Sequence, residues 1–296
     1  MASTSLNPSD VNKLVLESFT SGWKSYQPKY PYIFEEREPQ RKDEKFSITA
    51  SGGDITQVAE GAAFPQVDIT EVGNKTVSQL EYKESLPVTE LLRRFDNYGT
   101  VVEEASKQGY RARLTMDRVG ATLISNATTT TTTWDGLALA NASHLIGNTG
   151  VTQSNVVSGA LTESTLNTAI INLRKMKDHN NQEMALMPRT LLVPANLAKK
   201  AFELTASQGS PESANRNSNF FNTLGLNVVV WELLTSTTAW MLLADKVFTR
   251  FRYLISIPPK VEYIRRPETG NYEYQLSFDM GAGVVDYLGA EHSTGT

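Results

Sequence analysis

The sequence contains no cysteine and few histidines. The missing cysteines exclude disulfide bonds, thiolate nucleophiles, cysteine-ligated zinc and iron–sulfur clusters. The three histidines are His144, His179 and His292, and no two of them stand four residues apart, the spacing that puts two ligands on one face of a helix. We therefore expect no metal site in this chain.

Neither sign of charge is in large excess. The chain has 28 Lys and Arg against 32 Asp and Glu, a net charge of −4, and the signs alternate over short distances, as in EEREPQRKDEK at residues 35–45. Proteins that bind nucleic acid tightly usually carry a basic stripe that contacts phosphates. Tight, sequence-specific DNA binding is therefore not expected, whereas weak contact with packed DNA stays open.

Long apolar runs are missing as well. Residues 1–20 lack the basic start and the unbroken apolar stretch of a signal peptide, and no window approaches the ~18 apolar residues of a membrane span. We expect the protein to stay in the cytoplasm of the cell that makes it, without contact with a membrane. With 296 residues, 40% of them hydrophobic, the chain is long enough for one large domain or two medium ones.

Residues 126–144, NATTTTTTWDGLALANASH, contain the clearest catalytic pattern, because they end in an adjacent Ser143 and His144. A serine hydrolase needs a nucleophile, a base and an orienting carboxylate in register, commonly on a G-x-S-x-G turn, and the sequence has no such turn. The threonine run and Asp135-Gly136 are typical of a helix end followed by a turn. We interpret the stretch as a loop and predict no catalytic residue.

One further motif suggests a cofactor only at first sight. Residues 281–286, GAGVVD, lack the third glycine of a dinucleotide fingerprint, and too little chain follows them for a βαβ unit. We therefore expect no cofactor-binding residues and no cofactor.

The longest helical pattern runs from about Asp96 to Leu123. At 1.5 Å per residue this helix would be roughly 40 Å long. Gly109 and Ala112, halfway along its apolar stripe, would let another backbone come close. The stripe has alternating spacings of four and three and comprises Tyr98, Val102, Ala105, Gly109, Ala112, Met116, Val119 and Leu123. The charged residues fall mostly on the other faces: Glu103, Glu104, Lys107, Arg111, Arg113 and Asp117.

The remaining segments complete an α+β pattern. Residues 46–90 have the alternation and turn signals of a long β-hairpin, which needs support from the rest of the fold or from a neighbouring subunit, because two strands alone are marginally stable in water. Residues 272–280, YEYQLSFDM, alternate strictly as one strand. Thr162 is placed to cap a second helix, and residues 189–265 indicate an α/β unit.

The N-terminal residues 1–40 are aromatic and contain proline, with Trp23, Tyr26 and Tyr30 among them. Such a segment has apolar groups to bury but little periodicity. Two interpretations stay open, which are an arm that lies on another surface and a frayed terminus with one short helix near Asp10–Phe19.

The order of these elements, together with four stretches of sequence, resembles a known family. The stretches are LEYKESLPVTELLRRFDNYGTVVEEASKQG, WDGLALANASH, LTESTLNTAIINLRKMKDHNNQEMALMPRTLLVPANL and GLNVVVWELLTSTTAWMLLAD. The chain is similar to the major capsid proteins of tailed bacteriophages with the HK-97-type fold and, within them, to the Mu-like major head subunit family. The resemblance covers most of residues 75–285 and is weaker over the first 70.

The resemblance implies a division of the chain. Residues 1–45 would be an N-terminal arm and residues 46–85 an extended loop hairpin. Residues 86–188 and 266–296 would form a peripheral domain, with a spine helix at about 96–123. Residues 189–265 would form an axial domain that meets its copies at the capsomer centre, with the polar loop Ser207–Asn219 near that axis.

The resemblance also implies the function. The protein would be a major capsid (head) protein, not an enzyme, that self-assembles through pentamers and hexamers into an icosahedral shell around the phage double-stranded DNA genome. It would be made and assembled in the cytoplasm of the bacterial host. Portal, scaffolding or decoration proteins would be further partners. Three alternatives are an encapsulin-type shell of a cellular compartment, a hydrolase that uses Ser143 and His144, and a monomeric binding protein without self-association.

Overall fold

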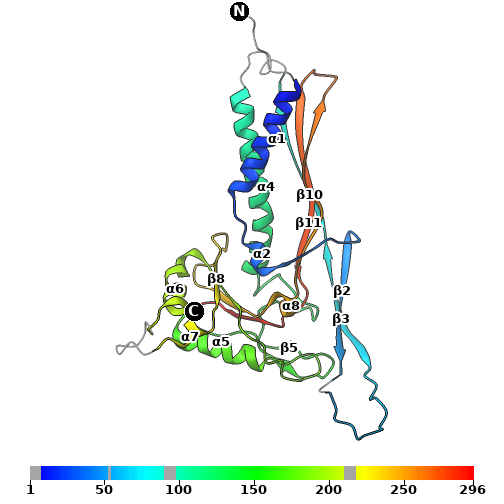
Figure 1. Ribbon diagram of the computed structural model, residues 1–296, viewed down its shortest axis with the longest axis vertical. Coiled ribbons are helices and arrows are strands. Elements are labelled where there is room, and N and C mark those ends of the chain that lie inside the picture. Colours follow the sequence, from blue (N-terminus) through cyan, green and yellow to red (C-terminus); the bar gives the residue numbers. More distant parts are fainter. Residues whose placement is uncertain (1–7, 53–54, 90–97, 210–217) are drawn as a thin grey trace, which may run out of the picture.

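The computed structural model describes residues 8–52, 55–89, 98–209 and 218–296. Figure 1 shows an elongated molecule with a narrow part and a broad lobe. In the narrow part, the helices α1 (Pro8–Ser25) and α4 (Tyr98–Ser125) run beside the long strands β10 (Phe251–Arg265) and β11 (Tyr272–Val284) (Figure 1). The broad lobe contains a second sheet, and a separate hairpin projects beside it.

The first sheet has the strand order β1-β10-β11-β4, where β1 is Glu35–Arg37 and β4 is Leu80–Val88. The central strand β11 has the strict alternation that the sequence predicts. Its buried side chains pack towards the helices, and the intervening ones are half-exposed, as a sheet covered on one face requires. The buried set is Tyr272, Tyr274, Leu276, Phe278 and Met280.

Helix α4 confirms the predicted long helix, apart from residues 96–97, which lie outside the described residues. Helix α1 packs along it at very close range. A Cβ atom added to Gly109 would lie 2.1 Å from the carbonyl oxygen of Phe19, and one added to Gly22 would lie 1.8 Å from that of Ser106. The backbone that approaches Gly109 is therefore the chain's own N-terminal helix. This excludes a frayed terminus for Pro8–Ser25.

The projecting hairpin consists of β2 (Asp43–Ser51) and β3 (Ile69–Ser78), which pair antiparallel. The predicted hairpin of residues 46–90 differs from this in its second half, because the chain leaves β3 at Gln79 and β4 pairs with β11 instead. A period of two identifies a strand but does not identify the strand's partner.

The GAG sequence of β11 explains how the hairpin crosses the first sheet. A Cβ atom added to Gly281 would lie 2.4 Å from the carbonyl oxygen of Ser78, and one added to Gly283 would lie 2.6 Å from a methyl group of Val77. These glycines leave room for the end of β3 to pass over β11.

The second sheet has the order β12-β9-β7-β8, with bounds Ala290–Ser293, Trp240–Leu243, Thr190–Val193 and Asn227–Val230. Strands β7 and β8 are parallel, and the other two pairs are antiparallel. Helix α5 (Glu163–Lys175) begins at Thr162, which forms a capping box with Thr165 and confirms the predicted cap. Shorter elements complete the lobe: η1 (Ala195–Leu197), α6 (Ala198–Ala206), α7 (Phe220–Thr223), α8 (Lys246–Thr249), β5 (His144–Leu145) and β6 (Thr152–Gln153).

Two strands join different sheets from those that the sequence suggested. Residues 251–265, expected within the α/β unit of residues 189–265, form β10 and pair with β11 in the first sheet. Strand β12, from the expected peripheral segment 266–296, completes the second sheet beside β9. Both strands pair with partners distant in sequence, which the local pattern does not encode.

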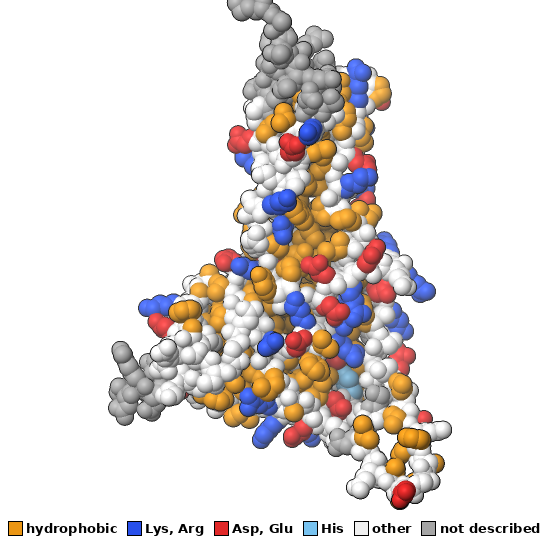
Figure 2. Space-filling model, viewed as in Figure 1, with side chains coloured by type: hydrophobic (Ala, Val, Ile, Leu, Met, Phe, Trp, Pro, Cys, Tyr) orange, Lys and Arg blue, Asp and Glu red, His pale blue; other side chains and the backbone are white. Residues whose placement is uncertain are grey.

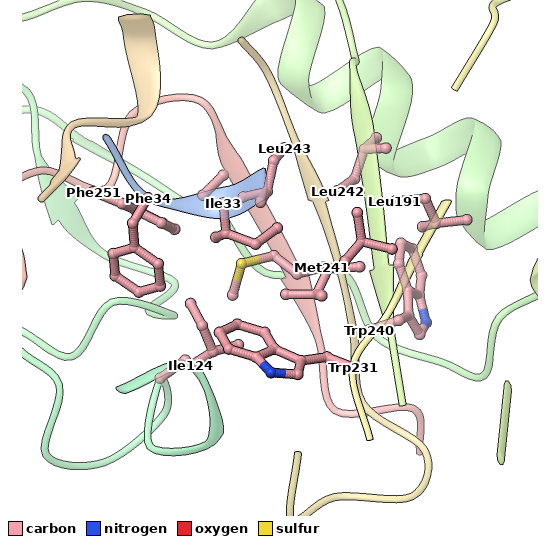
Figure 3. Packing of buried hydrophobic residues seen from close by; sticks show 14 of the residues in the cluster. Ile33, Phe34, Ile124, Leu191, Trp231, Trp240, Met241, Leu242, Leu243 and Phe251 are labelled. Carbon is pink, nitrogen blue, oxygen red and sulfur yellow. The ribbon is translucent and has the colours of Figure 1, made fainter. Parts of the chain in front are cut away.

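One hydrophobic core joins the two parts. It combines Ile33 and Phe34, which end and follow the helix α2 (Tyr30–Ile33), with Ile124 of α4 and with strands of the second sheet. Figure 3 shows Ile33, Met241 and Trp231 next to one another in this core. Residues 8–34 are therefore part of the folded subunit.

Candidate assembly surfaces and the polar contacts that position them

A buried carboxylate connects the arm, the long helix and the broad lobe. Asp117 of α4 is fully buried. It accepts hydrogen bonds from the Tyr26 hydroxyl (2.6 Å), the backbone N–H groups of Lys29 and Tyr30 (2.7 and 2.8 Å) and Nε1 of Trp231 (2.9 Å). Four donors satisfy both oxygens, which is the condition under which a buried carboxylate is tolerated.

The sequence placed Asp117 on a charged face of the helix, and the structure corrects this. The face that contains Met116 and Asp117 continues to Gly120, where an added Cβ atom would lie 3.1 Å from both Trp231 and Tyr30. The helix there meets aromatic rings on two sides. The only signal in the sequence was the position of Asp117 next to the apolar stripe, one residue after Met116.

A second buried pair organises the loop after α4. The Asp135 carboxylate lies 2.8 Å from Nδ1 of His144 and also accepts bonds from the Thr133 hydroxyl (2.6 Å) and the Leu137 N–H (3.1 Å). Burial by itself raises the pKa of Asp135, but the hydrogen bonds from His144 and Thr133 outweigh it and lower the pKa to about 2. The other ring nitrogen of His144 lies 3.0 Å from the Leu139 carbonyl oxygen. Both ring nitrogens thus face oxygen atoms that can accept a hydrogen bond.

This geometry gives Ser143 and His144 a structural role. The His144 ring is fully buried and stacks on Tyr287, with centroids 4.0 Å apart and an interplanar angle of 7°. Ser143 is exposed, and its backbone N–H donates to Asn141. Neither His144 nitrogen is available to activate the Ser143 hydroxyl, so the pair has no nucleophile-and-base geometry. The sequence did not explain this histidine, whereas the contacts with Asp135 and Tyr287 do.

A third polar cluster fixes the root of the β2–β3 hairpin. Asp286 accepts from Nε1 of Trp134 (3.2 Å) and lies 2.8 Å from Nε2 of His179. The Trp134 ring in turn covers Gly73 of β3, where an added Cβ atom would lie 2.5 Å from the ring. Within the described residues, the hairpin root also packs through Ile48 and Val77 against Leu254 and Val285. The root therefore has its own support within the subunit.

The distal part of the hairpin is different. Ile55 and Phe64 are essentially fully exposed, at 102% and 94%, and Val58, Val67 and Ile69 are exposed as well. Figure 2 shows hydrophobic side chains gathered on this lower extension of the molecule. Exposed apolar groups clustered on a projecting segment are typical of a surface that another protein covers.

The broad lobe has further exposed apolar side chains. Met187, Phe202 of α6 and Val247 of α8 are more than half exposed, and Phe220 of α7 is close to half. Residues 210–217 of the expected polar loop lie outside the described residues. In the part of the chain that the structure describes, no group of three or more His, Asp or Glu side chains could hold a metal ion, and no helix is long and apolar enough to cross a membrane.

Comparison with family models explains these features together. The model of the phage capsid protein family matches residues 74–292, which is most of the chain. The chain belongs to this phage capsid protein family. It is therefore a structural shell protein and not an enzyme, in agreement with the geometry of Ser143 and His144.

Solved structures show that this capsid protein has the fold of phage shells. The procapsid of bacteriophage JBD30 aligns with 97% of this chain and 76% of its own at 10% identity, with a TM-score of 0.55. The capsid of cyanophage P-SCSP1u aligns with 90% and 88% at 14% identity, with a TM-score of 0.58. A virus-like particle from Pyrococcus furiosus aligns with 95% and 98% at 12% identity, with a TM-score of 0.54. No relative was found among curated proteins.

These matches confirm the predicted fold class and the expected role as a capsid protein. The encapsulin-type alternative has no better support, because the family model is that of phage capsid proteins. Residues 74–292 also include all four stretches on which the resemblance rested.

Proposed function

We propose that this capsid protein assembles through pentamers and hexamers into an icosahedral shell that encloses the double-stranded DNA genome of a phage. The observation that carries the proposal is the hairpin, whose root is fixed by Trp134 and whose tip exposes Ile55 and Phe64. A rigid root and an apolar tip suit a segment that lies on a neighbouring subunit. Contacts of this heterologous kind, repeated around an axis, close into rings.

We further propose how the parts of the chain divide this work. Residues 1–45 act as an arm, α4 as the spine of a peripheral domain, and the sheet β12-β9-β7-β8 as the core of an axial domain, whose exposed α6 and α7 face its copies around the capsomer axis. The extended loop comprises β2, β3 and their connection. These assignments follow the sheet membership, so β10 goes with the peripheral domain and β12 with the axial domain.

Membership in the Mu-like subfamily and assembly in the cytoplasm of a bacterial host belong to the same proposal. So do contacts with a portal, with scaffolding or decoration proteins and with packaged DNA. With a net charge of −4, contact with DNA would be weak and independent of sequence. An encapsulin-type shell would instead contain a protein cargo, so the contents of purified particles separate the two: nuclease-protected DNA supports the phage assignment, and a single cargo protein contradicts it.

Assembly can be tested on the protein expressed alone, and then with proteins encoded beside it, by negative-stain electron microscopy and light scattering. Closed shells, five- or six-membered rings or tubes are expected. The Ile55→Ser/Phe64→Ser variant should lose most of this assembly and keep the circular dichroism of the wild type. The control is Ile171→Ser, an exposed apolar position on α5. A monodisperse monomer under all these conditions, or full assembly of the hairpin variant, would contradict the proposal.

A further inference from the structure

A cleft of about 560 Å³ lies at the root of the projecting hairpin. It forms where the β1–β2 connection and the β3–β4 junction meet strands β10 and β11. Figure 1 shows the β1–β2 connection as the dark blue turn above β2, beside these long strands. We call it the root cleft and define it by Arg41, Lys42, Gln79, Leu80, Glu81 and Asp279.

The root cleft has one basic wall and one acidic wall. Arg41 and Lys42 form the basic wall, and Glu81 of β4 stands directly opposite Asp279 of β11 in the sheet register. Like charges directly opposite each other in a sheet are destabilising, so a positive charge beside Glu81 and Asp279 would reduce their repulsion. Over the described ranges, Arg41, Lys42 and Asp279 form no ion pair, and Glu81 has only the exposed Lys83 at 2.5 Å. Within the described residues, Arg41 and Lys42 on the basic wall and Asp279 on the acidic wall therefore carry charge that no ion pair of their own subunit compensates.

Gln79 forms the floor between the walls. This residue is 7% exposed. The Gln79 backbone N–H donates to the Lys42 carbonyl oxygen (3.0 Å), and the Gln79 Nε2 donates to the Arg41 carbonyl oxygen (2.7 Å). These bonds hold the basic wall next to the acidic one. Its Oε1 has no donor among the residues that the structure describes, although a buried carbonyl oxygen without a donor costs free energy. The next residue, Leu80, also lines the cleft and is 62% exposed.

We propose that the root cleft is a self-complementary contact between two copies of this chain, related by a two-fold axis near Leu80. Arg41 and Lys42 of each copy face Glu81 and Asp279 of the other, and the two Leu80 side chains meet at the centre. This is the arrangement of an isologous interface, in which one patch contacts the same patch of the partner. The inference rests on the proposed assembly and adds the position and chemistry of one contact.

The charges favour a second copy over a metal ion as the occupant. A cation would be repelled by Arg41 and Lys42 in the same cleft, and the described residues offer no cluster of three ionisable ligands there. A second copy instead supplies both signs at once. Complementary charges of this kind fix the register of a contact and exclude wrong pairings.

Two oppositely charged variants test the pairing. The Glu81→Lys/Asp279→Lys variant makes both walls basic, and the Arg41→Glu/Lys42→Glu variant makes both acidic. Each variant alone should reduce the yield of particles by a factor of about ten or greater, because like charges then face each other across the contact. Mixed at equal amounts, the two should assemble together, since every contact between unlike copies pairs opposite charges. The control is Lys175→Glu, a solvent-exposed position on α5.

The cysteine-free chain allows a second test that does not depend on complete shells. In a Leu80→Cys variant, any disulfide must join two copies, and oxidation should give a dimer on a non-reducing gel. Ile171→Cys, on α5 at 44% exposure, measures random collision. A dimer yield equal to that of Ile171→Cys, or wild-type assembly of both charged variants, would overturn the root-cleft proposal. Neither result would affect the shell function, which fails only if the wild type does not assemble with its partners.

Discussion

At the scale of single residues, Asp117 is the buried side chain whose hydrogen bonds connect α4 with both the N-terminal residues and the broad lobe. Its carboxylate accepts hydrogen bonds from two segments, residues 26–30 and Trp231, that lie 87 to 114 residues away in the sequence. No local pattern in α4 encodes these partners, so the sequence indicated only that a charged residue stood beside an apolar stripe. The same holds for His144, whose stacking partner Tyr287 comes from the C-terminal part of the chain.

We predict that Asp117→Asn destabilises the subunit by about 2–4 kcal/mol, because the amide nitrogen cannot accept the hydrogen bonds that the carboxylate oxygen accepts. Urea unfolding followed by tryptophan fluorescence measures this, since Trp231 is one of the donors. Asp279→Asn, a change of the same kind in a half-exposed residue, should shift the midpoint little. Equal midpoints for the two variants would show that Asp117 is not the central contact.

The Asp135–His144 pair predicts a pH dependence in acid. The folded pKa of Asp135 is about 2, below its ordinary value of 3.8, so the unfolded chain binds the proton more tightly. The pair therefore contributes stability above pH 3.8 that is lost as the pH falls through about 2, which corresponds to about 2 kcal/mol. Asp135→Asn should be less stable than the wild type at pH 6, and the difference should narrow between pH 4 and pH 2. A constant difference over this range would contradict the assignment.

At the scale of elements, the close packing of α1 on α4 depends on Gly22 and Gly109, which have no side chain to separate the two backbones. The sequence indicated that Gly109 would admit another backbone, but it did not identify which one. The periodicities predicted α4, α5 and β11 well, because each buries one continuous face. They failed for the partners of β4 and β10, because pairing in a sheet is decided by distant strands and by glycines such as Gly281, which allow the crossing.

We predict opposite effects from two alanine substitutions in the same helix. Gly109→Ala should destabilise by about 1–3 kcal/mol or displace α1, because its Cβ atom would lie 2.1 Å from the Phe19 carbonyl oxygen. Gly99→Ala meets no atom within 4 Å and should stabilise by about 0.5–1 kcal/mol through helix propensity. Thermal unfolding and hydrogen exchange in α1 distinguish them. Exchange in α1 that is unchanged in Gly109→Ala would contradict the close packing.

At the scale of the whole molecule, the two parts share one core through Ile33, Ile124 and Trp231. The α+β class and the capsid role followed from element order and from the four resembling stretches. The hydrophobic core shared by residues 30–34, α4 and the second sheet did not follow from them, because it depends on contacts between segments far apart in the chain. Of the two interpretations that the sequence allowed for residues 1–40, the packing of α1 on α4 excludes the frayed terminus.

The shared core predicts that the monomer unfolds as one unit. In a Trp23→Phe variant, tryptophan fluorescence reports on the lobe and the hairpin root through Trp134, Trp231 and Trp240, whereas far-ultraviolet circular dichroism is dominated by the long helices. Both signals should show the same midpoint in urea, as expected for two-state unfolding. Separate midpoints, with the helical signal persisting after fluorescence is lost, would show that the narrow part folds independently of the lobe.

The contact of Trp134 with Gly73 also has a mechanical consequence. Trp134 covers Gly73, and β3 continues four residues, roughly 13 Å, beyond it to Ile69 before the chain goes on to the tip. A rotation of about 5° at Gly73 would move the end of the strand by about 1 Å, and the tip beyond it by more. Copies of one chain could then contact neighbouring subunits at slightly different angles through rotation of the β2–β3 hairpin, while the folded lobe and the long helix keep their shape.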